Sequence, residues 1–218
     1  MSTAIATAVL ISGSGTNLQA LIDARNADPA FPADLQLVIS NRADAAGLAR
    51  AERAGIRTLV IPHRDYASRE EFDAAIDEAL EEAGIEFVCL AGFMRILTQT
   101  FMAKWRERML NIHPSLLPAF TGNRAHEQVL ASTATLSGCT VHAVTEELDG
   151  GPIVGQVAVP RHSADTLDSL SARVRQAEHL LYPAAVRVFL TGDQTGADAL
   201  TVPSDMLMSF NTRTRYRR

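Results

Sequence analysis

The stretch Ala6-Thr7-Ala8-Val9-Leu10-Ile11-Ser12-Gly13-Ser14-Gly15-Thr16-Asn17 joins an apolar run to two closely spaced glycines. The apolar run predicts a buried strand, and the pattern from Leu18 to Arg25 predicts a helix. Glycines let a backbone approach an anion closely, and the N–H groups at a helix start attract negative charge. The stretch therefore predicts a phosphate-binding strand, turn and helix. A tight turn without a ligand is the alternative, since the third glycine of dinucleotide sites and the lysine of triphosphate loops are missing.

Strands and helices alternate in the sequence that follows. Short apolar runs predict strands at residues 35–40, 58–61 and 87–91. The helices between them are expected to end at Gly55 and Gly84, and Ser68 with Glu71 predicts a capping box. Continuous apolar strands are typical of sheets covered on both faces. The alternation predicts an α/β fold, doubly wound, with a mostly parallel twisted sheet and helices on both faces, a variant of the Rossmann type.

Length and composition narrow the class of protein. The 218 residues suit one domain, which we place at residues 1–192, followed by a loosely ordered tail at 193–218 that is rich in Thr and Asp. The hydrophobic fraction of 47% excludes wholesale disorder. A net charge of −5 offers no basic field, so we expect no nucleic-acid partner. The sequence leaves monomer and homodimer open.

Hydropathy and cysteine usage indicate where the protein is located. No apolar run approaches the roughly 20 residues of a membrane helix, and the first residues have no leader-like pattern. We therefore expect a cytoplasmic protein with no membrane partner. Cys89 and Cys139 lie far apart within apolar runs, which predicts two core residues and neither a disulfide nor a metal site.

A second stretch, Leu110-Asn111-Ile112-His113-Pro114-Ser115-Leu116-Leu117-Pro118, sets an amide and an imidazole at the end of another buried strand. Residues two apart in a strand face the same side, so Asn111 and His113 are expected together. The prolines that follow force the chain out of the sheet as a loop. Ligands of open α/β sheets bind at this end of the strands. The alternative is a histidine whose nitrogens are satisfied by neighbouring backbone.

Three other places carry candidate side chains. Asp149 directly precedes Gly150 and Gly151, which impose an unusual backbone path that could turn its carboxylate inward. His142 alternates with apolar residues in a predicted strand, either facing the same cleft or acting as a hydrogen-bonded bystander. Phe93 follows the strand at 87–91, where a flat apolar ligand could lie or where the aromatic ring could simply pack at a helix start.

With these stretches in view, the chain resembles the folate-dependent formyltransferases, in particular those of purine synthesis, over roughly residues 6–190. Each motif alone is modest, but five in the right order are specific. The motifs are Ser12-Gly13-Ser14-Gly15-Thr16-Asn17, Leu90-Ala91-Gly92-Phe93-Met94-Arg95-Ile96-Leu97, Asn111 to Pro118, Leu148-Asp149-Gly150-Gly151-Pro152, and Glu178-His179 with Tyr182-Pro183.

The resemblance implies transfer of the formyl group of 10-formyltetrahydrofolate, as co-substrate, to the amine of 5'-phosphoribosylglycinamide (GAR), without a metal. It implies a catalytic set of Asn111, His113 and Asp149. Residues implied for GAR binding are Gly15, Thr16, Asn17 and Glu178. Residues implied for the folate site are Arg69, Met94, Arg95, Ile96, Leu97, Asn111, Thr145, Glu146, Glu147, Leu148 and Asp149.

The residue types suit that chemistry. Asn111 and a protonated His113 can donate hydrogen bonds to the oxyanion that forms when an amine attacks a formyl carbon. Asp149 would hold the imidazole and favour its charged form. The route of the proton stays open between Asp149, His113 and water. The chain departs from the family pattern at Asn123-Arg124, where Leu and then His or Asp are common, and at Arg175, where Gln is common.

Two rival functions share part of this pattern. A formyltetrahydrofolate hydrolase has the same Asn, His and Asp set but delivers water, and usually carries an additional amino-terminal regulatory domain. A non-enzymatic nucleotide-binding regulator would use only the first strand, turn and helix, and would leave Asn111, His113 and Asp149 unexplained.

Overall fold

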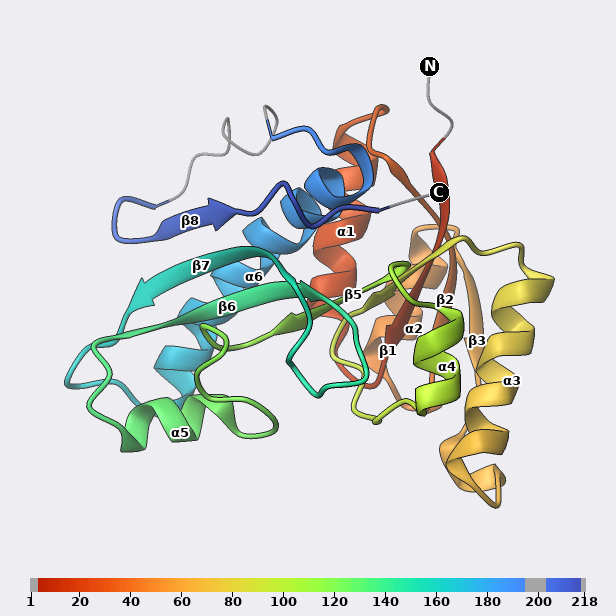
Figure 1. Ribbon diagram of the computed structural model, residues 1–218, viewed down its shortest axis with the longest axis horizontal. Coiled ribbons are helices and arrows are strands. Elements are labelled where there is room, and N and C mark those ends of the chain that lie inside the picture. Colours follow the sequence, from red (N-terminus) through yellow and green to blue (C-terminus); the bar gives the residue numbers. More distant parts are fainter. Residues whose placement is uncertain (1–3, 195–202, 217–218) are drawn as a thin grey trace. The chain divides into compact units, whose positions relative to one another are not determined.

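The computed structural model describes residues 4–194 and 203–216 (Figure 1). The chain divides into two compact units, with the boundary between Asn111 and Ile112. The predicted α/β class is confirmed, because parallel strands alternate with helices in the first unit and an antiparallel group with two helices forms the second. The assignment of residues 1–192 to one domain stays a prediction.

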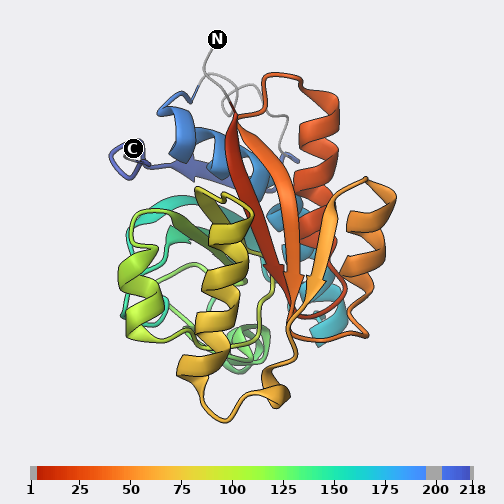
Figure 2. The same cartoon turned by 90° about the vertical axis from the view of Figure 1, so that its right-hand side faces the viewer.

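The first unit is a parallel sheet whose strand order is β3-β2-β1-β4-β5. The strands are β1 (Ile5–Ile11), β2 (Ala33–Ser40), β3 (Arg57–Val60), β4 (Phe87–Leu90) and β5 (Met109–His113). The helices are α1 (Thr16–Ala27), α2 (Ala46–Arg53), the 3-10 turn η1 (His63–Asp65), α3 (Arg69–Glu82) and α4 (Gln99–Lys104). In Figure 2, α1 and α2 lie on one side of β1, β2 and β3, and α3 lies on the other. This is the doubly wound arrangement that the sequence predicts.

Local sequence explains where these helices begin and end. Gly55 and Gly84 adopt positive φ after α2 and α3, as the sequence predicts for glycines that end helices. Ser68 caps α3 by accepting a hydrogen bond from the Glu71 N–H at 3.1 Å. The Glu71 carboxylate accepts from the N–H of Ala67, one residue before the predicted Ser68, so the capping box is shifted at this end.

The second unit is an antiparallel group of β6 (Leu136–Ala143), β7 (Ile153–Pro160) and β8 (Leu207–Phe210). Its helices are α5 (Ala125–Ala131) and α6 (Leu167–Thr191), and α6 packs on β6 and β7. The loop that follows β5 ends at Arg124, just before α5. Pro183 lies inside α6 without ending the helix.

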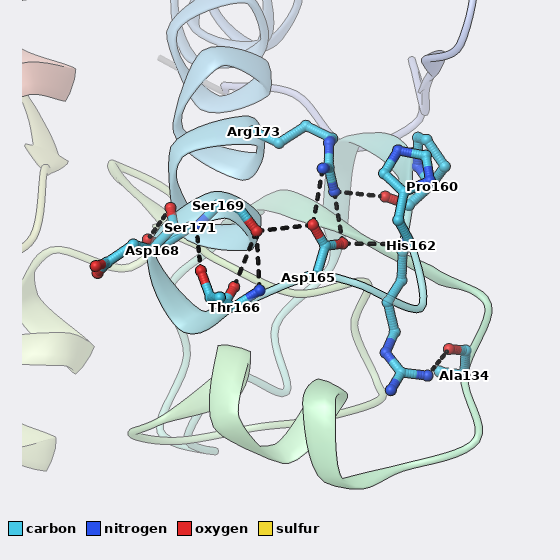
Figure 3. A network of polar contacts seen from close by, with 10 residues as sticks. Ala134, Pro160, His162, Asp165, Thr166, Asp168, Ser169, Ser171 and Arg173 are labelled. Carbon is cyan, nitrogen blue, oxygen red and sulfur yellow. Dashed lines mark hydrogen bonds and ion pairs between the residues drawn. The ribbon is translucent and has the colours of Figure 1, made fainter.

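The start of α6 is held by a polar network (Figure 3). Thr166 and Ser169 exchange two hydrogen bonds that satisfy the first free N–H groups of the helix. Arg173 donates to both carboxylate oxygens of Asp165 at 2.9 Å, and to the carbonyl of Pro160. This bidentate contact holds the pKa of Asp165 well below its usual range. The network fixes α6 to the end of β7.

The end of the chain differs from the loosely ordered tail that the sequence predicts. Leu207–Phe210 pair with β7 as an edge strand, and the ring of Phe210 lies over Gly155, where a Cβ would stand only 2.7 Å from it. Tyr216 donates its N–H to the carbonyl of Phe189 at the end of α6. The part of the predicted tail at 195–202 and 217–218 lies outside the described residues.

Buried apolar side chains form a core in each unit, and Cys89 and Cys139 lie within these cores, as predicted. In the described ranges, no helix combines the length and hydropathy needed to cross a bilayer.

Candidate active site

The loop that follows β1 has the geometry of an anion site. Ser12 is buried, Gly13 and Ser14 are exposed, and Gly15 takes the left-handed conformation (φ 69°) just before α1. In the part of the chain that the structure describes, no side chain caps the start of α1. The N–H groups at the start of a helix lie at the positive end of its dipole, so the start of α1 suits an anion.

Helix α2 braces this loop from behind. The Gly47 N–H donates to the carbonyl of Gly13 at 3.0 Å, and Arg50 Nε donates to the carbonyl of Ser14 at 2.9 Å. A Cβ on Gly15 would stand 2.5 Å from the Cα of Gly47, so the close approach of α1 and α2 requires glycine there. A Cβ on Gly13 would meet nothing within 4 Å. The loop thus has no room for a side chain at Gly15, whereas it has room for one at Gly13.

The segment after β4 presents apolar side chains at the same sheet edge. Met94 and Ile96 are 70% and 61% exposed, whereas Leu97 is buried beneath them. The N–H of Thr98 donates to the buried carboxylate of Asp73 at 2.6 Å, which anchors the segment to α3. Burial raises the pKa of Asp73. Exposed apolar side chains on an anchored segment suit a flat ligand. Arg69 lies exposed at the start of α3 and Arg95 is half-buried.

In the second unit, His113 and Asp149 meet. Asp149 Oδ2 lies 3.5 Å from His113 Nδ1, and both side chains are 7% exposed. His113 Nε2 lies 3.0 Å from the carbonyl of Phe120, so acceptor oxygens face both ring nitrogens. A doubly protonated ring would satisfy both. The Gly122 N–H donates to Asp149 Oδ2 at 2.7 Å and holds the carboxylate in place. These contacts bring together two of the predicted catalytic residues.

The inward orientation of Asp149 follows from its backbone, as the sequence predicts. Asp149 adopts positive φ (55°), a conformation that is uncommon for residues other than glycine but that aspartate tolerates better than most. A Cβ on Gly151 would clash with the carbonyl of Ala143, and a Cβ on Gly150 would clash with the side chain of Glu147. The chain can make this turn because glycines follow Asp149, and the turn points the carboxylate toward His113.

His142, for which the sequence allows either a place in the cleft or a bystander role, lies close to the same carboxylate. Its Nε2 stands 3.8 Å from Asp149 Oδ1, and its Nδ1 lies 3.0 Å from the carbonyl of Ala143. Burial lowers the pKa of His142. If the ring of His142 is neutral, His113 is the histidine that can form an ion pair with the carboxylate of Asp149. Its alternation with apolar residues on β6 was the one available signal for this placement.

His126, in the first turn of α5, is a second histidine that the sequence analysis did not single out. Burial lowers its pKa, and the positive charges of Arg175 and His113 lower it further. In the residues that the structure describes, the buried Nδ1 of His126 has no hydrogen-bond partner. Arg124 at the start of α5 takes positive φ and pairs with Glu127. The two departures from the family pattern, at Arg124 and Arg175, therefore each place an exposed positive charge near α5.

The other residues that the family resemblance implies lie on β5, on α6 and in the turn before Asp149. Asn111 is half-buried in β5, two residues before His113. Glu178 is half-buried in α6. Thr145 to Leu148 form the turn before Asp149, with Glu146, Glu147 and Leu148 exposed. Among the described side chains, no group of three or more His, Cys, Asp or Glu could hold a metal ion.

The imidazole of His113 is a hydrogen-bond donor held beside the carboxylate of Asp149. Separately, the loop before α1 offers an anion site at a helix start. An imidazole oriented by a buried carboxylate can stabilise a developing negative charge or move a proton. Such a pair fits acyl transfer, in which an oxyanion forms and a proton changes place.

Comparisons with known proteins agree with this geometry. Residues 5–186 match the formyl transferase family model. The chain is 56% identical over 185 residues to the human trifunctional purine biosynthetic protein adenosine-3, covering 85% of this chain but only 18% of that protein. It is 44% identical to phosphoribosylglycinamide formyltransferase of Escherichia coli, covering 84% of this chain and 86% of that one. Glycinamide ribonucleotide transformylase 1 of Symbiobacterium toebii superposes with a TM-score of 0.84 at 44% identity, over 94% and 93% of the two chains.

Proposed function

Since the chain belongs to the formyl transferase family, we propose that it transfers the formyl group of 10-formyltetrahydrofolate to the amine of GAR, in purine biosynthesis. The observation that carries the proposal is the buried His113–Asp149 pair, held by Phe120 and Gly122 at the end of β5. The names of relatives that this chain covers almost completely identify the same reaction for those proteins.

The reaction requires three things of the protein. The amine nitrogen forms a bond to the formyl carbon, the bond from that carbon to N10 of the folate breaks, and one proton passes from the amine to N10. We assign oxyanion stabilisation to Asn111 and His113 and orientation of the imidazole to Asp149. Both nitrogens of His113 already face acceptor oxygens, one on Phe120 and one on Asp149. A hydrogen bond from His113 to the oxyanion therefore requires one of these two contacts to lengthen. Asp149, at 3.5 Å, is the looser partner.

The two substrates are assigned to different features. The loop Gly13 to Asn17 suits the phosphate of GAR, because helix-start N–H groups face a site that α2 braces from behind. The exposed side chains of Met94 and Ile96 suit the pteridine ring of the folate. Arg69, Arg95, the turn from Thr145 to Leu148, and Glu178 retain the roles that the family resemblance implies. A cytoplasmic location, and a monomer or homodimer, remain our expectations.

A charge placed in the loop tests the assignment of the acceptor. Gly13→Asp should raise the KM for GAR at least about fivefold, because two like charges 4 Å apart repel by about 1–4 kcal/mol between water and a protein surface. The KM for 10-formyltetrahydrofolate should change little. Gly13 suits this substitution better than Gly15, since its Cβ would meet nothing within 4 Å. Gly13→Asn is the matched control, equal in size but uncharged.

Release of tetrahydrofolate, followed with and without GAR, separates transferase from hydrolase. We expect turnover to depend on GAR in the wild-type protein. Consumption of the folate at full rate without an amine acceptor, unaffected by Gly13→Asp, would establish the hydrolase. An equal effect of Gly13→Asp and Gly13→Asn on the KM for GAR would show that the loop does not hold the phosphate.

A further inference from the structure

Four loops of the first unit are joined by a row of hydrogen bonds. The Met94 N–H donates to Ser12 Oγ at 2.8 Å, and Ser12 Oγ donates to Asn41 Oδ1 at 2.7 Å. Asn41 Nδ2 lies 3.2 Å from His63 Nδ1. Ser12 and Asn41 are both buried, and His63 is half-buried. We refer to Met94, Ser12, Asn41 and His63 as the edge row.

The edge row follows the sheet. Met94 comes after β4, Ser12 after β1, Asn41 after β2 and His63 after β3, and these strands are neighbours in the order β3-β2-β1-β4. The row therefore runs along the carboxyl edge of the parallel sheet, where open α/β sheets bind their ligands. Each of its members lies one or a few residues beyond a strand end.

The donors and acceptors in this row follow one direction along it. A backbone N–H can only donate, so Met94 uses a lone pair of Ser12 Oγ. In the structure the hydroxyl of Ser12 donates its proton to Asn41 Oδ1, so the amide nitrogen of Asn41 faces away from Ser12. The amide nitrogen of Asn41 must donate to His63 Nδ1, which must therefore carry a lone pair. The row assigns His63 to the neutral tautomer with its proton on Nε2.

In the proposed function, the hydrogen bond between Ser12 and Met94 joins the binding sites of two different substrates. Ser12 opens the loop that we assign to the GAR phosphate, and Met94 opens the segment that we assign to the folate. The hydroxyl of Ser12 is the direct hydrogen bond between them. We propose that Ser12 is a positioning residue that couples the two sites, so that binding of one substrate favours the binding-competent conformation of the other. This inference rests on the proposed function.

Coupling of this kind is a ratio of dissociation constants. Tetrahydrofolate and GAR form a non-reactive pair, since no formyl group is present. By calorimetry, we expect GAR to lower the Kd of tetrahydrofolate at least about fivefold in the wild-type protein, the lower end of typical coupling. Ser12→Ala should bring this ratio close to one, and Ser12→Thr, which keeps the hydroxyl, should restore it. A structural defect alone would weaken both ligands and leave the ratio unchanged.

A second measurement tests the row without any substrate. The ¹⁵N chemical shifts of His63, measured by NMR at about pH 8 where an imidazole is neutral, distinguish its two tautomers. The proton should lie on Nε2 in the wild-type protein, and Ser12→Ala should introduce the other tautomer by freeing the Asn41 amide to turn. A wild-type His63 protonated on Nδ1 would overturn the row.

The outcomes separate the two proposals. If neither tetrahydrofolate nor GAR binds, the proposed function fails, while the tautomer of His63 still decides the row. If both ligands bind but the wild-type ratio is one, or Ser12→Ala leaves the ratio unchanged, the coupling by Ser12 is overturned and the proposed function stands.

Discussion

At the scale of single residues, His113 depends on what surrounds it. Its two nitrogens face a backbone carbonyl and a carboxylate, and that carboxylate is itself held by the N–H of Gly122. The neighbouring His142 approaches the same carboxylate, but burial lowers its pKa. One imidazole is thus suited to carry charge and the other to remain neutral, although both lie near Asp149.

Removal of the His113 ring should reduce kcat by about 100- to 1000-fold, since a charged oxyanion donor is lost. Asp149→Asn should be comparably damaging while preserving shape, because the amide can neither hold nor charge-stabilise the ring in the same way. Single-turnover kinetics, with circular dichroism as a check on folding, measure both effects. Near-normal turnover by His113→Ala would remove this residue from the mechanism.

The lowered pKa of His142 also predicts a dependence of stability on pH. Below the ordinary histidine pKa of 6.5, the unfolded chain binds a proton that buried His142 does not accept. The free energy of unfolding should therefore fall as the pH falls from about 7 to 5, by at most about 1.4 kcal/mol per pH unit for this residue. Urea titrations of His142→Gln should show a shallower dependence than the wild type.

His126 contributes in the same direction, so some dependence on pH should survive in His142→Gln. Substitution of the exposed His162 by Gln serves as the control and should preserve the wild-type slope. An identical slope in His142→Gln would mean that the ring titrates alike in the folded and unfolded chains.

At the scale of elements, the segment after β4 combines an anchor with an exposed surface. Leu97 is buried and the N–H of Thr98 is tied to Asp73, whereas Met94 and Ile96 face outward. The sequence could identify this segment because its motif is contiguous. It could equally place β1 to β5, the turn at Gly150-Gly151 and the inward carboxylate of Asp149, since each follows from local apolar runs, glycines and prolines.

Features that depend on contacts between distant residues escaped prediction. The strand β8 forms because Leu207–Phe210 pair with β7 and the ring of Phe210 packs over Gly155, and a four-residue segment carries no sign of that pairing. His142 and His126 reach the surroundings of His113 only through tertiary packing. The edge row joins loops up to 82 positions apart, which no local pattern can reveal.

A charge on the exposed segment tests its assignment to the folate. Ile96→Asp should weaken tetrahydrofolate at least about tenfold in calorimetry, because a carboxylate must be desolvated against the ring. GAR binding should change less than about twofold. Leu136→Asp, at an exposed apolar position elsewhere, is the matched control. Equal losses of both ligands would indicate a folding defect rather than a folate surface.

At the scale of the whole molecule, strand β5 runs through the boundary between the two units without a linker. Its residues Met109, Leu110 and Asn111 pair with β4, and its last residue His113 contacts Phe120 and Asp149 in the second unit. Strand β5 therefore belongs in part to each unit.

We accordingly predict that residues 1–192 unfold as one domain. Calorimetry should give a single transition whose calorimetric enthalpy equals the van't Hoff enthalpy. Two resolved transitions, or a calorimetric enthalpy well above the van't Hoff value, would show that the units unfold separately.

The two buried cysteines can report such opening through their reactivity. Cys89 lies in β4 and Cys139 in β6, so each unit carries one fully buried thiol. Burial also raises the pKa of the Cys139 thiol, and a thiol must lose its proton to react. A maleimide added to the native protein should thus modify either cysteine only during transient exposure. Peptide mapping of the adduct then gives the rate at which each cysteine is modified, and so the rate at which each unit opens locally, with no engineered label.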